Sequence, residues 1–333
     1  MKNNFSQHGF TLIELMIALT LGLILVAVAV QLFISGQVNY RIQQAAATVQ
    51  DSGVFSLNAM TKTIRLANHG NAGAMNDETL YGGIVLSAQT TGGTPARSGN
   101  LAGLKFGSTA ITGNDYISKT AATDSAFGTV QSDQLVIIYQ APYEMSTCTG
   151  QTVKGPDRSN TDLMKGWYVV EKYYIKKRAD NSGSDLYCSD AMFIAKNETV
   201  PQRLGSGTSA VTLATAETLI ANYGTATGQL LAPNVEYMAV QLVVRDRTNK
   251  IGTMSMTSYT DLPVSTTQRR PAVIGLNLGW LVRSNEKVEN LVSKNYSVLG
   301  QALTVPNDRF MRHVFSTTIA LRNGGLGELI NEN

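Results

Sequence analysis

The chain has 333 residues, of which 15% are charged and 43% hydrophobic, and its formal net charge is +3. This length suits one membrane helix with one sizeable globular domain, or two small domains. So weak a positive charge argues against a nucleic-acid-binding protein. Few charged residues and many small polar ones favour an exported, β-rich domain over a cytosolic enzyme.

The first 34 residues are a polar leader followed by an apolar segment. Residues 1–9 form the leader, and the run 10–34 contains one charged residue, Glu14. Twenty-five helical residues span about 37 Å, enough to cross a hydrocarbon core of about 30 Å. The polar-to-apolar junction precedes the apolar run, so cleavage there leaves the hydrophobic segment on the mature chain, unlike cleavage of a secretory signal peptide.

Glu14 is unusual in this segment because a charged side chain in a membrane helix costs a few kcal/mol. One interpretation is a signal anchor whose Glu14 reaches a nearby headgroup region. The other is that this carboxylate has a partner and a role.

Residues 9–16 read GFTLIELM. This segment resembles, at every position, the processing and assembly motif of type IV prepilins. The resemblance implies that prepilin peptidase cleaves between Gly9 and Phe10, that the new Phe10 amine is methylated, and that Glu14 is an assembly determinant. The chain therefore resembles a type IV pilin-like subunit, and its length favours a minor pilin.

The apolar run continues into an amphipathic pattern. Hydrophobic or small residues recur at steps of three and four, at Val38, Ile42, Ala46, Val49, Gly53, Leu57, Met60, Ile64 and Ala67. This spacing predicts one long helix from about Phe10 to Ala67, with Gly70 as its stop. We expect a transmembrane and amphipathic helix over 10–69 and a β-rich extracytoplasmic domain over 70–333. Glycines inside the helix allow it to bend or to make close contacts, and the sequence leaves both open.

After residue 70 the chain shows short β-type runs separated by polar and glycine-rich loops. The predicted strands are 83–87, 134–139, 166–175, 191–195, 235–245, 274–282 and 314–321. Met238, Val240, Leu242 and Val244 alternate onto one face, whereas 167–175 is interpreted as apolar on both faces. Loops are expected at 90–95 and 205–209, and a short helix at 213–222. The fold class is α+β.

The two cysteines, Cys148 and Cys188, cannot form a metal site alone and lack CxxC spacing. In an exported domain they suggest one disulfide, whose loop of about 41 residues is worth roughly 4 kcal/mol. Two unrelated buried thiols are the alternative.

No catalytic motif is present in the sequence. His69 and His313 are expected to be structural or surface residues. Residues 180–185 are rich in oxygen donors but lack a closing glutamate, so they favour a hairpin loop over a calcium site. The aromatic residues at 167–174 are expected to pack in the core. We therefore expect a non-enzymatic protein without metal or cofactor.

The C-terminal third adds to the resemblance. Residues 279–284, GWLVRS, and 312–323, RHVFSTTIALRN, are similar to the closing strands of PilW-type minor pilins. The resemblance implies insertion in the inner membrane, then placement in a pilus at the cell surface, in a complex that primes assembly. Its implied partners are prepilin peptidase, other minor pilins, the major pilin, the assembly platform and a tip adhesin.

Two other functions fit the same residues. A minor pseudopilin of a type II secretion system shares the motif and architecture. A membrane-anchored adhesin or DNA-binding module would use residues 87–234 as its binding surface, for which the sequence suggests no family. Deletion of the gene separates the pilin from the pseudopilin: a pilin would be needed for pili and twitching, and a pseudopilin for exoprotein secretion. Binding assays at two salt concentrations test the DNA-binding function.

Overall fold

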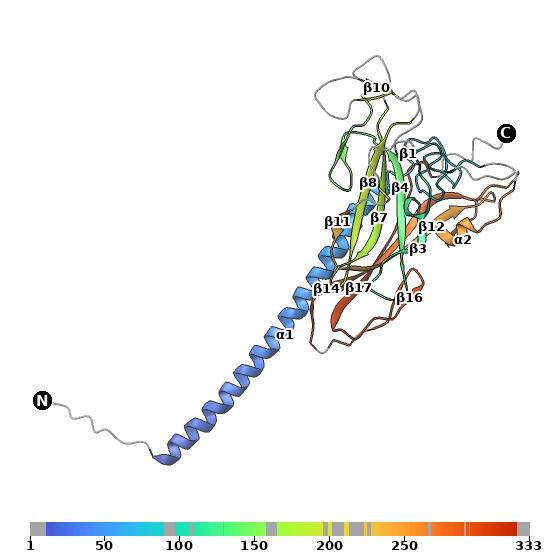
Figure 1. The fold of residues 1–333 in the computed structure, drawn as a ribbon. Helices are drawn as coiled ribbons and strands as arrows, with labels where there is room; N and C mark the ends of the chain where they lie inside the picture. Colours follow the sequence, from blue (N-terminus) through green and yellow to red (C-terminus); the bar gives the residue numbers. More distant parts are fainter. Residues whose placement is uncertain are drawn as a thin grey trace.

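The computed structural model describes residues 11–89, 97–106, 109–128, 130–157, 165–195, 199–201, 210–212, 223–224, 228–265, 268–289, 291–292 and 294–324. It shows a long helix attached to a β-rich domain, an α+β fold (Figure 1). The predicted leader with Phe10, the helix at 213–222 and the loops at 90–95 and 205–209 lie outside the described residues.

Helix α1 runs from Leu12 to Ile64. It ends three residues before the predicted Ala67, and residues 65–70 form turns. The backbone N–H of Asn68 donates to the carbonyl of Ile138 (3.1 Å), so a contact with the sheet draws the backbone out of the helix. Asn68 and Gly70 both have positive φ, at 69° and 107°, in the turn that follows. Gly70 therefore shapes this turn and is not the helix cap.

Two antiparallel sheets form the domain. The first has the order β11-β8-β7-β4-β3, with bounds Gln229–Ala232, Ser184–Phe193, Tyr168–Lys177, Ser132–Gln140 and Lys119–Thr123. The second has the order β13-β12-β14-β17, with bounds Ile251–Ser255, Val235–Arg245, Ala272–Lys287 and Phe310–Ala320.

Short elements connect and cover these sheets. They are β1 (Lys105–Phe106), β2 (Thr109–Ala110), η1 (Asn114–Tyr116), β5 (Met145–Ser146), β6 (Thr152–Val153), β9 (Thr199–Pro201), β10 (Ala210–Thr212), α2 (Met256–Thr260), β15 (Tyr296–Val298) and β16 (Gln301–Leu303). The β1–β2, β5–β6, β9–β10 and β15–β16 pairs each form a two-stranded ribbon.

Most predicted strands exist, with shifted ends. Strand β12 has the predicted bounds, whereas β8 starts at Ser184, seven residues before the predicted 191. The expected strand at 83–87 is reduced to one bridge between Ile84 and Ile137. The N–H of Leu86 donates to the side chain of Asn100 (2.8 Å) instead of a neighbouring strand, which ends the ladder.

The main core lies between the two sheets and the second half of α1. The predicted face of β12 enters it, with Met238, Val240, Leu242 and Val244 all buried. The sheets are also joined by hydrogen bonds. Asp133 on β4 accepts from the N–H of Val240 on β12 (2.7 Å) and from the N–H of Ala121 on β3 (2.9 Å). One buried carboxylate thus holds β3, β4 and β12 together.

Candidate assembly helix and its attachment to the domain

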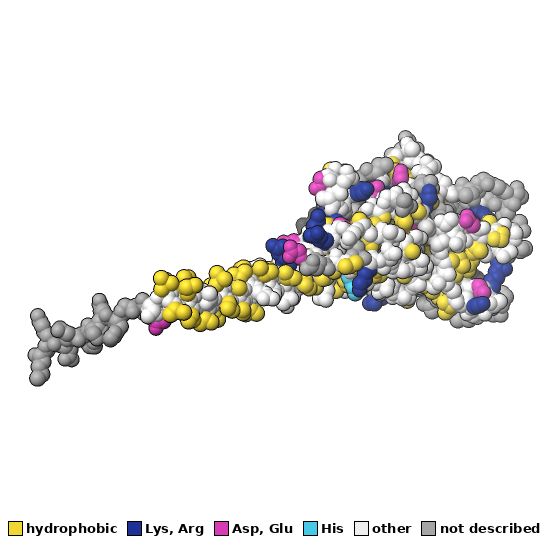
Figure 2. Space-filling view, turned by 90° about the horizontal axis from the view of Figure 1, so that it is seen from below, with side chains coloured by type: hydrophobic (Ala, Val, Ile, Leu, Met, Phe, Trp, Pro, Cys, Tyr) yellow, Lys and Arg dark blue, Asp and Glu magenta, His cyan; other side chains and the backbone are white. Residues whose placement is uncertain are grey.

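The first half of α1 carries an uncovered apolar surface. Every residue from 11 to 37 is exposed, and the apolar side chains form a continuous band along the helix (Figure 2). The helix is long and apolar enough to cross a membrane. An exposed apolar surface of this length is unfavourable in water, so it indicates contact with lipid or with other apolar helices.

Glu14 lies in the first turn of this helix and caps it. Its carboxylate accepts from the N–H and the hydroxyl of Thr11, both at 3.0 Å, while the Thr11 hydroxyl accepts from the N–H of Glu14 (3.3 Å). This reciprocal capping box satisfies backbone donors that the helix cannot pair. Phe10, on one side of the predicted cleavage site, lies outside the described residues.

The second half of α1 packs on the domain through small and medium side chains. Its buried residues are Ala45, Val49, Gly53, Ser56, Met60, Thr63 and Ile64, close to the stripe predicted from the sequence. A Cβ built on Gly53 would come within 2.2 Å of the Phe315 ring on β17, whereas one on Gly22 or Gly36 would meet open space. Gly53 therefore serves close contact between helix and sheet.

A polar network links the helix to the sheet inside the core. The hydroxyl of Thr63 on α1 is 2.6 Å from that of Tyr173 on β7, which donates to the Glu171 carboxylate (2.5 Å). The Tyr139 hydroxyl donates to the same carboxylate (3.0 Å). Each member of this network therefore has a partner although all are buried.

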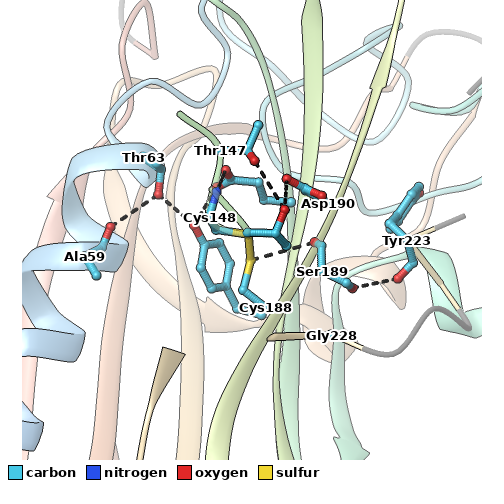
Figure 3. The surroundings of a disulfide bond; sticks show 12 residues. Ala59, Thr63, Thr147, Cys148, Cys188, Ser189, Asp190, Tyr223 and Gly228 are labelled. Carbon is cyan, nitrogen blue, oxygen red and sulfur yellow. Dashed lines mark hydrogen bonds between the residues drawn. A yellow bond between two sulfur atoms is a disulfide. The ribbon is translucent and has the colours of Figure 1, made fainter. Parts of the chain in front are cut away.

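The predicted disulfide joins Cys148 to Cys188, with 6.2 Å between their Cα atoms. It ties the loop around β5 and β6 to β8, and Thr63 on α1 lies in its surroundings (Figure 3). The N–H of Cys148 donates to Glu171 (2.8 Å), and the Thr149 hydroxyl donates to Asp190 (2.7 Å). The alternative of two unrelated buried thiols is wrong. Glu171 connects Cys148 through Tyr173 to Thr63 on the helix.

Glu171 is the residue that the sequence interpretation missed. It is completely buried, and burial raises the pKa of its carboxyl. Residues 167–175 are therefore not apolar on both faces. Lys172 is buried as well, and its ammonium donates to the carbonyls of Asp115 and Gly224 (both 3.0 Å). Two adjacent charged residues, Glu171 and Lys172, in an otherwise apolar strand were the sequence signal that could have predicted these buried polar contacts.

The other predicted residues take structural positions. His69 is 2.6 Å from the Gln140 carbonyl through Nδ1, and His313 packs edge-on against Phe315. The 180–185 segment forms the β7–β8 turn, in which Asp185 pairs with Arg178. Among the described residues, no group of three or more His, Cys, Asp or Glu is placed to hold a metal ion.

Comparison with known proteins places both ends of the sequence. A family model described as the type IV pilus-assembly protein W matches residues 172–323, and the prokaryotic N-terminal methylation motif matches residues 4–30. A type IV-like pilin from Thermus thermophilus is similar at 9% sequence identity and a TM-score of 0.34, covering 83% of this chain and 97% of that chain. No curated protein matches significantly.

The two matched regions coincide with the apolar helix and with much of the β-rich domain. The methylation motif covers Glu14 and most of the exposed apolar helix. The protein W match runs from Lys172 in β7 to Asn323, so it covers the whole second sheet and leaves β3 and β4 of the first sheet outside. The chain therefore carries the type IV prepilin methylation motif at its start and a PilW domain over its second half, as a type IV pilin-like protein does.

Proposed function

We propose that this protein is a non-enzymatic minor pilin that helps to prime assembly of a type IV pilus. In this proposal α1 anchors the precursor in the inner membrane, with the domain on the periplasmic side, and the subunit later enters the pilus. The observation that carries it is the fully exposed apolar half of α1, with Glu14 at its start. The domain does not cover the apolar surface of residues 11–37. Such an uncovered surface is needed in a subunit that first contacts lipid and later packs against the helices of other subunits.

Glu14 supplies the selectivity in this proposal. Cleavage after Gly9 gives Phe10 a positive amine beside the apolar segment, and in a packed fibre Glu14 meets the Phe10 amine of a neighbouring subunit. An unpaired carboxylate among apolar helices is unfavourable, and pairing offsets that cost. The pair therefore favours one axial register over unspecific hydrophobic association.

The capping box sharpens the test of this role. Glu14→Ala removes both the charge and the cap, whereas Glu14→Gln removes the charge and retains an acceptor suited to the cap. We expect both variants to insert and to be cleaved, and both to co-purify poorly with the other minor pilins and the major pilin. Thr11→Ala, which breaks the cap and keeps the charge, is the matched control and should co-purify normally.

Normal co-purification of Glu14→Gln would contradict the charge-pairing role, and helix capping would then be the remaining role of Glu14. Intact-mass analysis of each membrane-extracted variant checks processing between Gly9 and Phe10. A wild-type protein that still begins at Met1 would overturn the processing step, and Gly9→Val should accumulate as precursor.

Gene deletion separates this function from its nearest rival. Loss of surface pili, twitching, adhesion or DNA uptake supports the pilin, whereas loss of exoprotein secretion with normal pili supports a type II pseudopilin. If the protein is a minor pilin, pull-down of the full-length protein should recover other minor pilins, the assembly platform or a tip adhesin.

A further inference from the structure

A small polar cavity lies where the β7–β8 turn meets β12, the end of β14 and the start of β17. Its volume is about 150 Å³. The charged residues that line it are Lys177, Glu236, Arg283, Asp308 and Arg312, and the turn contributes Asn181, Ser182 and Gly183. Three cations face two carboxylates, so the lining carries a balance of one positive charge.

Arg312 is fully paired inside this cluster. Its guanidinium donates to Glu236 (2.6 and 3.1 Å) and to Asp308 (2.7 and 2.6 Å). Burial alone would lower the pKa of Arg312, but these hydrogen bonds outweigh burial and raise it. One arginine therefore occupies both carboxylates of the cavity.

Arg283 is left short of acceptors. Its side chain is 9% exposed, its Nη2 donates to the Ser182 carbonyl (2.8 Å), and its Nη1 lies 3.6 Å from Glu236. Among the described residues, its Nε has no hydrogen-bond partner. The guanidinium also stacks 4.1 Å from the centre of the Phe310 ring. Burial, opposed by Glu236 and reinforced by Arg312, lowers the pKa of Arg283.

Lys177 is the third cation of the lining. Its side chain is exposed, and among the described residues no carboxylate lies within 4.0 Å of its ammonium. A buried arginine with unused donors beside a cavity indicates a missing acceptor, because such donors are rarely left unpaired.

We propose that this cavity binds a single carboxylate group, held by Arg283 and by Lys177. The surplus of one positive charge fits a singly charged anion better than a phosphate, and a planar carboxylate matches the guanidinium. The carboxylate comes from an acidic residue of a neighbouring subunit, the C-terminus of another polypeptide, or a free small acid. All three offer the same recognised chemistry.

The test is an acetate titration of the detergent-solubilised full-length protein labelled with ¹⁵N-arginine. The readout is the Nε–H resonance of Arg283, identified by its absence in Arg283→Lys. We expect it to move and saturate with acetate, and to stay in place with acetamide or with sodium chloride at equal ionic strength. No movement with acetate, or equal movement with chloride, would overturn the proposal.

Two neighbouring lysines provide a matched pair that does not depend on the folding of an Arg283 variant. Lys177→Gln should weaken acetate binding about two- to fivefold, as expected for one exposed charge contact. Lys176 lies over the Tyr187 ring and is not part of the cavity lining, so Lys176→Gln should leave binding unchanged. An equal effect of the two substitutions would contradict the site.

Two blocked amino acids then identify the source. Glutamate acetylated at its amine and amidated at its α-carboxyl presents the γ-carboxylate of an acidic residue, and acetylalanine presents the α-carboxylate of a polypeptide end. Tighter binding of the first than of acetate supports a neighbouring acidic residue, and tighter binding of the second supports a C-terminus. Acetate as the tightest ligand supports a free acid. These measurements use the isolated protein, so their outcome is independent of any role in pilus assembly.

Discussion

The two halves of α1 belong to one continuous helix but meet different surroundings. From residue 11 to 37 every side chain is exposed, whereas from Ala45 to Ile64 one face is buried against the sheets. The exposed half is built largely of Leu, Ile and Val, while the buried face includes Ala45, Gly53, Ser56 and Thr63. Large apolar residues are thus on the uncovered half, because lipid or other helices must cover it, and small residues let the sheets approach closely.

Breaking the disulfide should have the largest effect on the buried half. Cys148 and Cys188 close a loop with a sequence separation of 40, so replacing both with Ser should lower the free energy of unfolding by about 4 kcal/mol. Urea unfolding followed by tryptophan fluorescence measures this loss, since both tryptophans are buried in the domain. Thiol labelling of the denatured, unreduced wild type should find no free thiol. An unchanged urea midpoint in the double Ser variant would show that the disulfide does not stabilise the domain.

Two isoleucines compare the halves directly. Ile64 is 0% exposed and Ile24 is 57% exposed. Ile64→Ala leaves a cavity beneath the helix and should cost about 3 kcal/mol of domain stability. Ile24→Ala should leave the urea midpoint of the domain unchanged. Similar losses from both substitutions would mean that the two halves are not energetically separate.

The stability of the domain that holds the buried half should depend on pH through Asp133, which joins the two sheets. Burial raises the pKa of this carboxyl to about 6 from 3.8. Between pH 4 and 6 the folded protein therefore binds more protons than the unfolded protein, so stability is greatest at the acid end and falls as pH rises. The shift corresponds to roughly 2 to 3 kcal/mol.

Glu171 contributes in the same direction, because burial raises its pKa too. The difference between wild type and Asp133→Asn, measured as urea midpoints across pH 4 to 7, isolates Asp133. Parallel curves for the two proteins would refute the assignment to Asp133.

The smallest expected effect is the coupling between Thr63 and Tyr173. A double-mutant cycle with Thr63→Val and Tyr173→Phe should give about 1 kcal/mol of interaction energy. Thr20 is the matched control, since its hydroxyl donates to the carbonyl of Ile17 within the exposed half (2.9 Å). A cycle of Thr20→Val with Tyr173→Phe should show no coupling. Coupling of equal size in both cycles would mean that the measured energy does not report the hydrogen bond.

Much of this architecture was predictable from local patterns. The apolar run, the stripe that follows it, the bounds of β12 and the cysteine pair are all local or compositional signals. The alternation at Met238 to Val244 worked because one face of that strand meets the core. The early end of α1 was not predictable, since it depends on a hydrogen bond from Asn68 to Ile138 across the fold.

The sequence by itself determined that an apolar helix with one acidic residue precedes a β-rich domain, because periodicity and composition act over a few neighbouring residues. Only the tertiary structure decided where that helix becomes buried, which carboxylates lie in the core, and which arginine is fully paired. Glu171 and Arg283 show the reason. Their surroundings come from strands and loops distant in the sequence, and burial and pairing are properties of those neighbours rather than of the residue itself.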